Sequence, residues 1–215
     1  MLEADSIAFG YNQHQLLKSV YVKLAVGEVV GLLGRNGCGK STLMKIIVGQ
    51  IDTEYKSIRL DGQATLVPLF LGNHVAYLPQ GDFIPKSLKV EKCLEFYNIN
   101  PLIINEYLPE LVVHLHKKVK DLSGGWARLL GLVLVLFSKA TFVFLDEPFS
   151  QLEPNFVELA SNLIRFQSAQ KGVLLSDHLY KQVLDITHRN YLLTNGQTYA
   201  VDGIEDLKQL GYVNI

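Results

Sequence analysis

Three short, mainly apolar runs are spaced along the chain, at residues 29–33 (VVGLL), 141–145 (TFVFL) and 172–176 (GVLLS). Each has the length of one strand and lacks an alternation of polar and apolar residues, which is typical of strands buried on both faces of a sheet. Segments with helical spacing of apolar residues separate them. Strands that alternate with helices in this way predict an α/β fold with a mostly parallel sheet.

Three helices are predicted around these strands. In residues 41–49, Leu43, Ile46 and Ile47 fall on one helical face, and a glycine is placed to end the helix. Residues 129–137 (LLGLVLVLF) are apolar all round, which indicates a buried helix. A further helix is predicted at residues 155–170, between the second and third apolar runs.

Both ends of the chain are predicted to contain antiparallel strands. Residues 6–11 (SIAFGY) and 19–26 (SVYVKLAV) are rich in β-branched and aromatic residues, and a turn is expected at residues 11–14. Residues 191–201 (YLLTNGQTYAV) place an Asn-Gly pair between two apolar runs, which predicts a hairpin. We therefore expect an N-terminal antiparallel β subdomain beside the parallel sheet.

The middle of the chain has a different pattern. Residues 89–99 and 105–119 have helical patterns, separated by an Asn-Pro break at residues 100–101. These helices predict a small inserted subdomain. The expected plan is a single domain over residues 1–215, with an α/β core and its β subdomain at residues 1–80 and 126–215 and the helical subdomain at residues 81–125.

Composition and charge narrow the class of protein. Of 215 residues 48% are apolar and the net charge is −1, so a globular domain is expected and the overall charge favours no nucleic-acid partner. Two cysteines, Cys38 and Cys93, are too few for a disulfide framework or a metal site, which fits a reducing cytosol. The N-terminus lacks a signal-peptide pattern, and the longest apolar run is shorter than the roughly 20 residues that span a bilayer. We expect a cytoplasmic chain that does not cross a membrane alone.

A glycine-rich segment follows the first apolar run directly. Residues 34–42 (GRNGCGKST) match the phosphate-binding pattern G-x-x-x-x-G-K-[ST] at every specified position. Glycines let backbone N–H groups turn inward around phosphate oxygens, and the start of the following helix adds its positive dipole end. In such a loop Lys40 reaches the β- and γ-phosphates and the Ser41 hydroxyl ligates Mg²⁺. A chance glycine turn is the alternative, and the strand before and the helix after the segment argue against it.

Every residue of this segment is therefore a candidate nucleotide-binding residue. They are Gly34, Arg35, Asn36, Gly37, Cys38, Gly39, Lys40, Ser41 and Thr42. Lys40 is also a candidate catalytic residue, and Cys38 is interpreted as a small filler within the loop.

An acidic pair ends the second apolar run. A carboxylate that emerges from a buried strand beside a phosphate loop can hold Mg²⁺ through water, and this role is assigned to Asp146. Glu147 is the candidate general base, or the group that polarises the attacking water. A solvated acidic pair at a strand end is the alternative, which the phosphate loop upstream disfavours.

The stretch Leu122-Ser-Gly-Gly precedes the apolar helix and then FVFLDEP at residues 142–148. In this order and approximate spacing, the chain resembles the ATP-binding cassette (ABC) ATPases, whose signature is LSGGQ. The resemblance covers nearly the whole chain. It implies a P-loop NTPase core and hydrolysis of ATP to ADP and phosphate with Mg²⁺.

The resemblance also assigns roles to three isolated residues. Gln80, in AYLPQG, corresponds to a glutamine that touches Mg²⁺ and water and senses a membrane partner. His178, in LLSDH, stands where the family places a switch histidine against the γ-phosphate. Tyr11 matches the aromatic residue that stacks on adenine, with a place in the core as its alternative. His114 and His116 stay unassigned, because their spacing is poor for two ligands on one helical face.

The resemblance implies a dimer, because in this family the LSGG of one subunit closes over the ATP held by another. Ser123, Gly124 and Gly125 would then bind the γ-phosphate of the partner's nucleotide. The implied protein is the cytoplasmic ATPase subunit of an ABC transporter. It would pair with a second ABC subunit, in a homodimer or heterodimer, and attach to the inner face of a membrane through an integral-membrane permease.

Two rival functions stay open beside this one. The first is a soluble ABC protein acting on ribosomes or DNA, and the second is a regulatory cassette that binds ATP but scarcely hydrolyses it. Trp126 stands in place of the signature glutamine, and this difference favours the regulatory cassette. Glu153, in place of the usual aspartate of the loop after Glu147, is a further departure from the family pattern. These departures concern the fit at the dimer interface and the rate of turnover.

Overall fold

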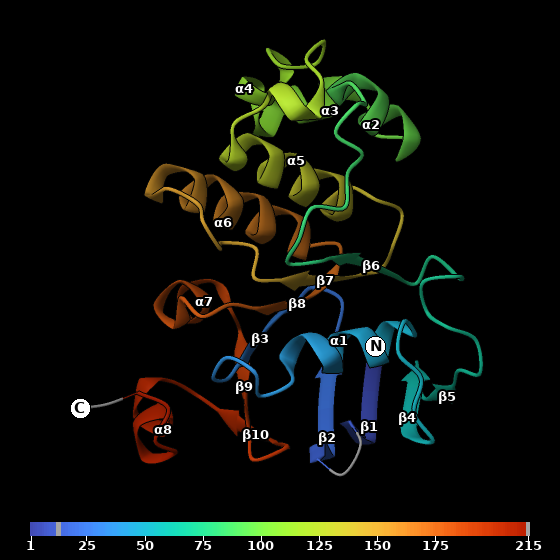
Figure 1. Cartoon of the computed structure of the whole chain (residues 1–215), viewed down its shortest axis with the longest axis vertical. Coiled ribbons are helices and arrows are strands. Elements are labelled where there is room, and N and C mark those ends of the chain that lie inside the picture. Colours follow the sequence, from blue (N-terminus) through green and yellow to red (C-terminus); the bar gives the residue numbers. More distant parts are fainter. Residues whose placement is uncertain (12–13, 214–215) are drawn as a thin grey trace.

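The computed structural model describes residues 1–11 and 14–213, so the middle of the turn expected at residues 11–14 lies outside the described residues. Its strands form one ten-stranded sheet in the order β5-β4-β1-β2-β10-β9-β3-β8-β7-β6. The sheet curls (Figure 1). In one half of it the neighbouring strands run mainly parallel, and in the other half they run antiparallel. The α/β class expected from the sequence is confirmed.

The parallel half contains the three predicted apolar strands, β3 (Val29–Leu33), β7 (Phe142–Asp146) and β8 (Gly172–Ser176). Every residue of these strands is buried, as their continuous apolar character predicts. β6 (Val75–Leu78) pairs in parallel with β7, and β9 (Arg189–Thr194) pairs in parallel with β3. The carboxyl ends of β3, β8 and β7 therefore lie at the same edge of the sheet.

The antiparallel half contains β1 (Leu2–Tyr11), β2 (His14–Leu24), β4 (Tyr55–Leu60) and β5 (Gln63–Ala64). β10 (Gln197–Val201) pairs antiparallel with β9 across the predicted Asn-Gly turn and makes one parallel pair with β2. The antiparallel N-terminal strands and the C-terminal hairpin are therefore confirmed. β10 is the strand that joins the two halves.

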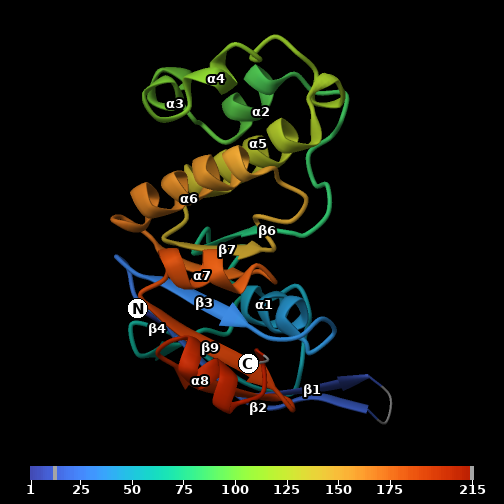
Figure 2. The ribbon, with the colours of Figure 1, turned by 90° about the vertical axis from the view of Figure 1, so that its left-hand side faces the viewer.

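The sheet separates two hydrophobic cores, as successive residues of β7 show. Phe142 and Phe144 belong to a core with α1 (Lys40–Val48) and the antiparallel strands. Val143 and Leu145 belong to the other core, with α5 (Gly124–Leu136) and α6 (Pro154–Ser168). Since alternate side chains of a strand point to opposite faces, α1 and α5 pack on opposite sides of the sheet. Figure 2 shows α5 and α6 side by side, with the short helices of residues 90–112 beyond them and away from the sheet.

The inserted helices differ from the prediction for residues 105–119. They are α2 (Val90–Phe96), α3 (Pro101–Tyr107), α4 (Pro109–Val112) and a 3₁₀ turn (Val119–Asp121). A single helix over residues 105–119 is wrong, because Pro109 has no N–H to continue α3 and instead begins α4. The Asn-Pro pair starts α3, since Asn100 Oδ1 accepts the Leu102 N–H at 3.0 Å, and α2 has already ended at Phe96.

Two short helices complete the described chain without a counterpart in the sequence prediction. α7 (Tyr180–Ile186) follows β8, and α8 (Ile204–Gln209) follows β10. Within the described residues, no helix has both the length and the apolar character needed to cross a membrane.

Candidate active site

The predicted phosphate loop connects the end of β3 to the start of α1. Gly39, the residue before α1, has φ of 109°, a left-handed value that favours glycine. A Cβ there would lie 3.1 Å from side-chain atoms of Leu16 and Leu17. In the described chain, α1 has no side-chain cap at its first turn and no acidic residue there. Its first N–H groups are thus available to an anion.

Lys40 is buried, with 6% of its surface exposed. Its Nζ donates to the Gly34 carbonyl at 2.7 Å and to the Arg35 carbonyl at 3.3 Å. Among the ion pairs of the described residues, none involves Lys40. Of the described residues, therefore, only main-chain carbonyls bind the ammonium group, which lies inside the loop.

The rest of the loop has mixed exposure. Asn36 and Gly37 are exposed, and Ser41 and Thr42 are half-buried in the first turn of α1. The Arg35 guanidinium is bound elsewhere, because its Nη2 donates to the Gly211 carbonyl at 2.8 Å, near the other end of the chain. These contacts leave the backbone, rather than the Arg35 side chain, facing the inside of the loop.

Burial raises the pKa of the Cys38 thiol, against a smaller opposing effect of the Lys40 charge. A thiol with a raised pKa stays protonated and is a poor nucleophile. This agrees with the interpretation of Cys38 as a filler.

Asp146 ends β7 as a buried carboxylate with only 1% exposure. The Tyr77 hydroxyl donates to its Oδ2 at 2.8 Å, and the Ser176 hydroxyl donates to its Oδ1 at 2.9 Å. Burial, with the nearby Asp146 charge, raises the pKa of Tyr77, so the phenol remains a proton donor. The side-chain donors to Asp146 are therefore neutral, and no lysine or arginine side chain of the described residues pairs with it.

Glu147 has a left-handed backbone with φ of 50°, which is uncommon for a residue other than glycine. Its N–H donates to the Ser176 carbonyl at 2.7 Å, and Gln80 Nε2 donates to its Oε2 at 2.7 Å. Backbone outliers of this kind concentrate at functional sites, where the surroundings hold them. The structure thus brings two predicted site residues, Gln80 and Glu147, into direct contact.

Arg128, on α5, binds the backbone of the segments that carry Gln80 and the acidic pair. The sequence analysis missed it. Its Nη1 donates to the Pro79 carbonyl at 2.7 Å, and its Nη2 donates to the carbonyls of Asp146 and Glu147 at 2.7 and 2.9 Å. Burial lowers the pKa of Arg128, although a guanidinium stays charged in proteins. A single arginine at the start of an otherwise apolar helix was the signal that could have found it.

His178 follows β8 and has about half of its side-chain surface exposed, 49%. Its Nδ1 lies 3.4 Å from Oδ1 of Asp177, which is fully buried. Asp177 was also missed, although it follows a buried strand in the same way that Asp146 ends one. The carboxyl ends of β3, β7 and β8 therefore carry the phosphate loop, the acidic pair and the histidine at one edge of the sheet (Figure 1).

Tyr11 lies at the end of β1, and 55% of its surface is exposed. Its ring packs edge-on against Phe9, with centroids 4.9 Å apart. The alternative that placed Tyr11 in the core is wrong. An exposed aromatic face at this position is free to stack on a ligand.

The signature residues lie at the N-terminus of α5, on the opposite side of the sheet from α1. Ser123 caps the helix, accepting the Trp126 N–H at 3.4 Å, and both Ser123 and Gly124 are exposed. A Cβ on Gly125 would lie 2.9 Å from the Phe156 ring, so this glycine also allows α5 to approach α6. One chain does not bring these residues together with its own phosphate loop.

Trp126, the departure from the signature, is packed rather than free. Its ring meets His114 and Phe156 edge-on, with centroid distances of 5.1 and 5.2 Å. It thus ties the start of α5 to α6 and to the segment after α4. Burial lowers the pKa of His114.

Comparison with known proteins gives one family and many relatives. The family described as ABC transporter matches residues 17–150. The lipopolysaccharide export system ATP-binding protein LptB of Acidithiobacillus ferridurans is 31% identical, over 96% of this chain and 92% of that protein. A probable branched-chain amino acid transport ATP-binding protein, LivF of Archaeoglobus fulgidus, is 29% identical over 92% and 89%.

Solved structures agree with these relatives. An ATP-binding subunit of an ABC transporter is 25% identical and superposes with a TM-score of 0.80, over 100% of this chain and 95% of that one. An ATP-binding cassette in its ADP conformation, 21% identical, has a TM-score of 0.81 over 97% and 93% and supports the fold alone.

Proposed function

The chain belongs to the ABC transporter family, and from this premise we propose that it hydrolyses ATP to drive a solute through a separate membrane permease. The observation that carries the proposal is the contact of Gln80 with Glu147 beside the buried Asp146. These groups lie at the sheet edge that also carries the phosphate loop. Relatives that are ATP-binding subunits of transport systems support the same reading.

The phosphates of ATP bind in the loop of residues 34–42. The free N–H groups at the start of α1 and the Lys40 ammonium group bind phosphate oxygens, and Lys40 exchanges its carbonyl partners for them. Arg35 takes part through its backbone, because its side chain is bound to Gly211. The Tyr11 ring stacks on the adenine.

The donor chemistry of the site fits Mg²⁺. Ser41, Gln80 and Asp146 offer a hydroxyl, an amide oxygen and a carboxylate, the oxygen ligands that Mg²⁺ prefers. Gln80 donates to Glu147 through Nε2, which leaves its amide oxygen free. When bound by these residues, Mg²⁺ supplies neutralisation of the phosphate charge.

Glu147 is the general base for hydrolysis. Its carboxylate takes a proton from the attacking water, whose oxygen bonds to the γ-phosphorus while the bond to the ADP oxygen breaks. Gln80 holds the Glu147 carboxylate in place at 2.7 Å, and Arg128 fixes its backbone carbonyl. His178 binds the γ-phosphate from the end of β8.

The signature residues complete the site of a second subunit. Ser123, Gly124 and Gly125 present a hydroxyl and N–H groups at the exposed start of a 13-residue helix, which is suited to bind a phosphate anion. Because α5 and α1 pack on opposite faces of the sheet, these groups serve the nucleotide of a partner ABC subunit.

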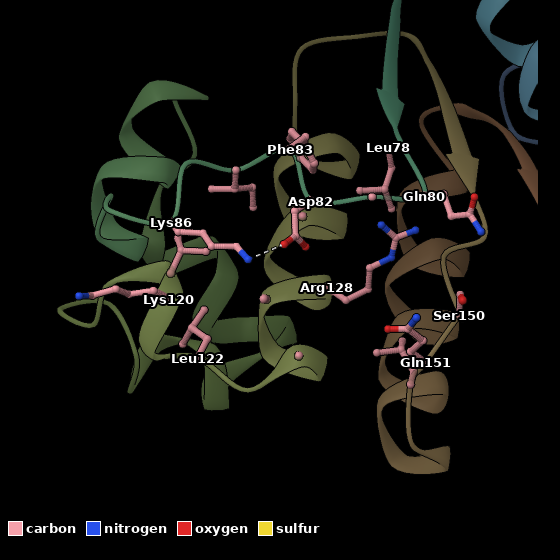
Figure 3. Close-up of a pocket in the computed structure, with 17 residues that line it drawn as sticks. Leu78, Gln80, Asp82, Phe83, Lys86, Lys120, Leu122, Arg128, Ser150 and Gln151 are labelled. Carbon is pink, nitrogen blue, oxygen red and sulfur yellow. Dashed lines mark ion pairs between the residues drawn. The ribbon is translucent and has the colours of Figure 1, made fainter.

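A cavity of about 330 Å³ lies between the segment that follows β6 (residues 80–86), the start of α5 with the residues before it (119–131), and residues 150–152. Figure 3 shows Phe83 and Leu122 on its wall, with Lys86 and Lys120 at one side and Arg128 at the other. Lys86 pairs with Asp82 at 3.0 Å. We assign this cavity to a cytoplasmic helix of the permease, which would hold the chain at the inner face of a membrane.

Glu147→Gln tests the catalytic role. The variant keeps the size of the side chain but loses the base, so we expect ATP binding to persist and hydrolysis to slow by about 10²-fold or more. Glu158→Gln, the same change at an exposed position of α6, is the control and should match the parent. Parent-like turnover by Glu147→Gln would exclude Glu147 as the base, and an inactive parent that binds ATP would favour the regulatory cassette.

A further inference from the structure

Asp177 is a fully buried carboxylate to which the proposed mechanism gives no role. A buried carboxylate is costly unless its oxygens are hydrogen-bonded or its charge is paired. Among the ion pairs of the described residues, its only partner is the imidazole of His178.

Both oxygens of Asp177 accept backbone hydrogen bonds. Oδ1 accepts the Leu179 N–H at 3.0 Å, in a local turn at the start of α7. Oδ2 accepts the Phe149 N–H at 2.9 Å, from the segment that follows Glu147. Asp177 thus joins two stretches of chain that are distant in sequence, one carrying the histidine and the other carrying the general base.

A second bond links the same two stretches. The Glu147 N–H donates to the Ser176 carbonyl at 2.7 Å, one residue before Asp177. The segment from Glu147 to Phe149 is therefore held at two points by the end of β8. A displacement of either stretch is transmitted to the other through these bonds.

His178 presents its Nδ1 to Oδ1 of Asp177 at 3.4 Å. A carboxylate can only accept, so the ring nitrogen that binds it must carry the proton. The distance is long for a hydrogen bond, and catalytic hydrogen bonds commonly tighten when the substrate binds. With Nδ1 on Asp177, Nε2 is the ring nitrogen left for the nucleotide.

We propose that Asp177 is a positioning residue, which holds His178 with Nδ1 protonated and couples it to the segment of Glu147. The inference rests on the proposed function, because it assumes that His178 serves the γ-phosphate. A carboxylate that orients a catalytic imidazole in the same way is found in serine proteases. Asp177 itself touches no nucleotide, and it acts through His178.

The first measurement leaves Asp177 unchanged. ¹⁵N-histidine labelling of the full chain reports which ring nitrogen of His178 carries the proton, with His178→Gln used to assign the signal. In alkaline buffer, where ordinary imidazoles are neutral, we expect the Nδ1-protonated tautomer. The Nε2-protonated tautomer would overturn the proposal.

The second measurement uses Asp177→Asn, whose amide has one acceptor oxygen for three donors. We expect His178 to lose its tautomer preference and kcat for ATP hydrolysis to fall at least about ten-fold, with KM for ATP changed less than about two-fold. Asp185→Asn, on the exposed side of α7, is the matched control and should leave both constants unchanged. An unchanged His178 spectrum in folded Asp177→Asn would also overturn the proposal.

Two further outcomes are distinguishable, one for the variant and one for the proposed function. If Asp177→Asn does not fold, the tautomer in the parent chain decides the matter alone. If the parent lacks ATPase activity while His178 carries its proton on Nδ1, the proposed function fails and the role of Asp177 in holding the imidazole stands.

Discussion

Two buried lysines show how the same residue type serves different ends in this chain. Lysine is rarely buried unless its charge is paired, yet among the described residues Lys40 and Lys171 both bind main-chain carbonyls only. Lys171 Nζ donates to the carbonyls of Ser138 and Ala140 at 2.6 and 2.5 Å, and burial lowers its pKa. Lys171 therefore has a structural role, because it holds the segment after α5 against the start of β8. Lys40 instead lies in a loop whose N–H groups are available to an anion.

Lys40→Met should weaken ATP binding by about ten-fold to more than a hundred-fold. The methionine keeps the apolar stem but removes a charge-assisted hydrogen bond, worth about 1.5–3 kcal/mol. Titration calorimetry with ATP and Mg²⁺ measures the change, and Lys139→Met, at an exposed position, is the control. Equal affinities of Lys40→Met and the parent would remove Lys40 from the site.

At the scale of elements, α5 connects the parts of the proposed site. Its first turn carries the signature residues, Trp126 packs it against Phe156 of α6, and Arg128 holds the backbone of the acidic pair. A rotation of α5 would therefore move groups that the proposal assigns to two different nucleotides. The close contact at Gly125 is one of the features that fix its position.

Adjacent glycines of α5 offer a matched test of this packing. Gly124→Ala adds a methyl group with no atom of the described residues within 4 Å and should stabilise the chain by up to about 1 kcal/mol through helix propensity. Gly125→Ala meets the Phe156 ring at 2.9 Å and should destabilise it by about 1–3 kcal/mol. Urea denaturation of both variants gives the two signs, and equal effects would show that α5 is free to shift.

The elements also show what a sequence can predict. The apolar runs of β3, β7 and β8 and the phosphate loop carry their signals locally, and the structure has them where predicted. The helix expected over residues 105–119 was wrong because its apolar spacing continues across Pro109 while its hydrogen bonds do not. Arg128 was missed because its partners lie 18 to 49 residues away in sequence. The bond between Asp177 and Phe149 spans 28 residues, so no local pattern in the sequence indicates it.

At the scale of the whole molecule, the proposed function needs chains that this one lacks. The signature residues begin a helix that packs on the opposite side of the sheet from α1, and the cavity beside Gln80 has a size suited to a few side chains of a docking helix. The proposed function therefore places the chain in an assembly of subunits.

Glu147→Gln, held with ATP and Mg²⁺ in the native host, should retain this assembly during gentle detergent extraction. We expect a polytopic membrane protein to co-purify in matching stoichiometry, and its identity would narrow the class of solute. Lys40→Met is the control, since it should not form the ATP-bound dimer. Ribosomes or DNA-repair proteins as the companions, with the chain absent from membranes, would favour the soluble alternative.

The position of β10 has a consequence for how the chain folds as it is synthesised. β10 lies between β2 and β9 in the sheet. The N-terminal strands are therefore joined to the parallel half of the sheet through β10, which is the last strand of the described chain. Contacts of such large sequence separation form slowly, and domains are completed from the N-terminus during translation. We therefore expect β1, β2 and β4 to emerge from the ribosome with an open sheet edge, which is exposed to aggregation until residues 197–201 close it.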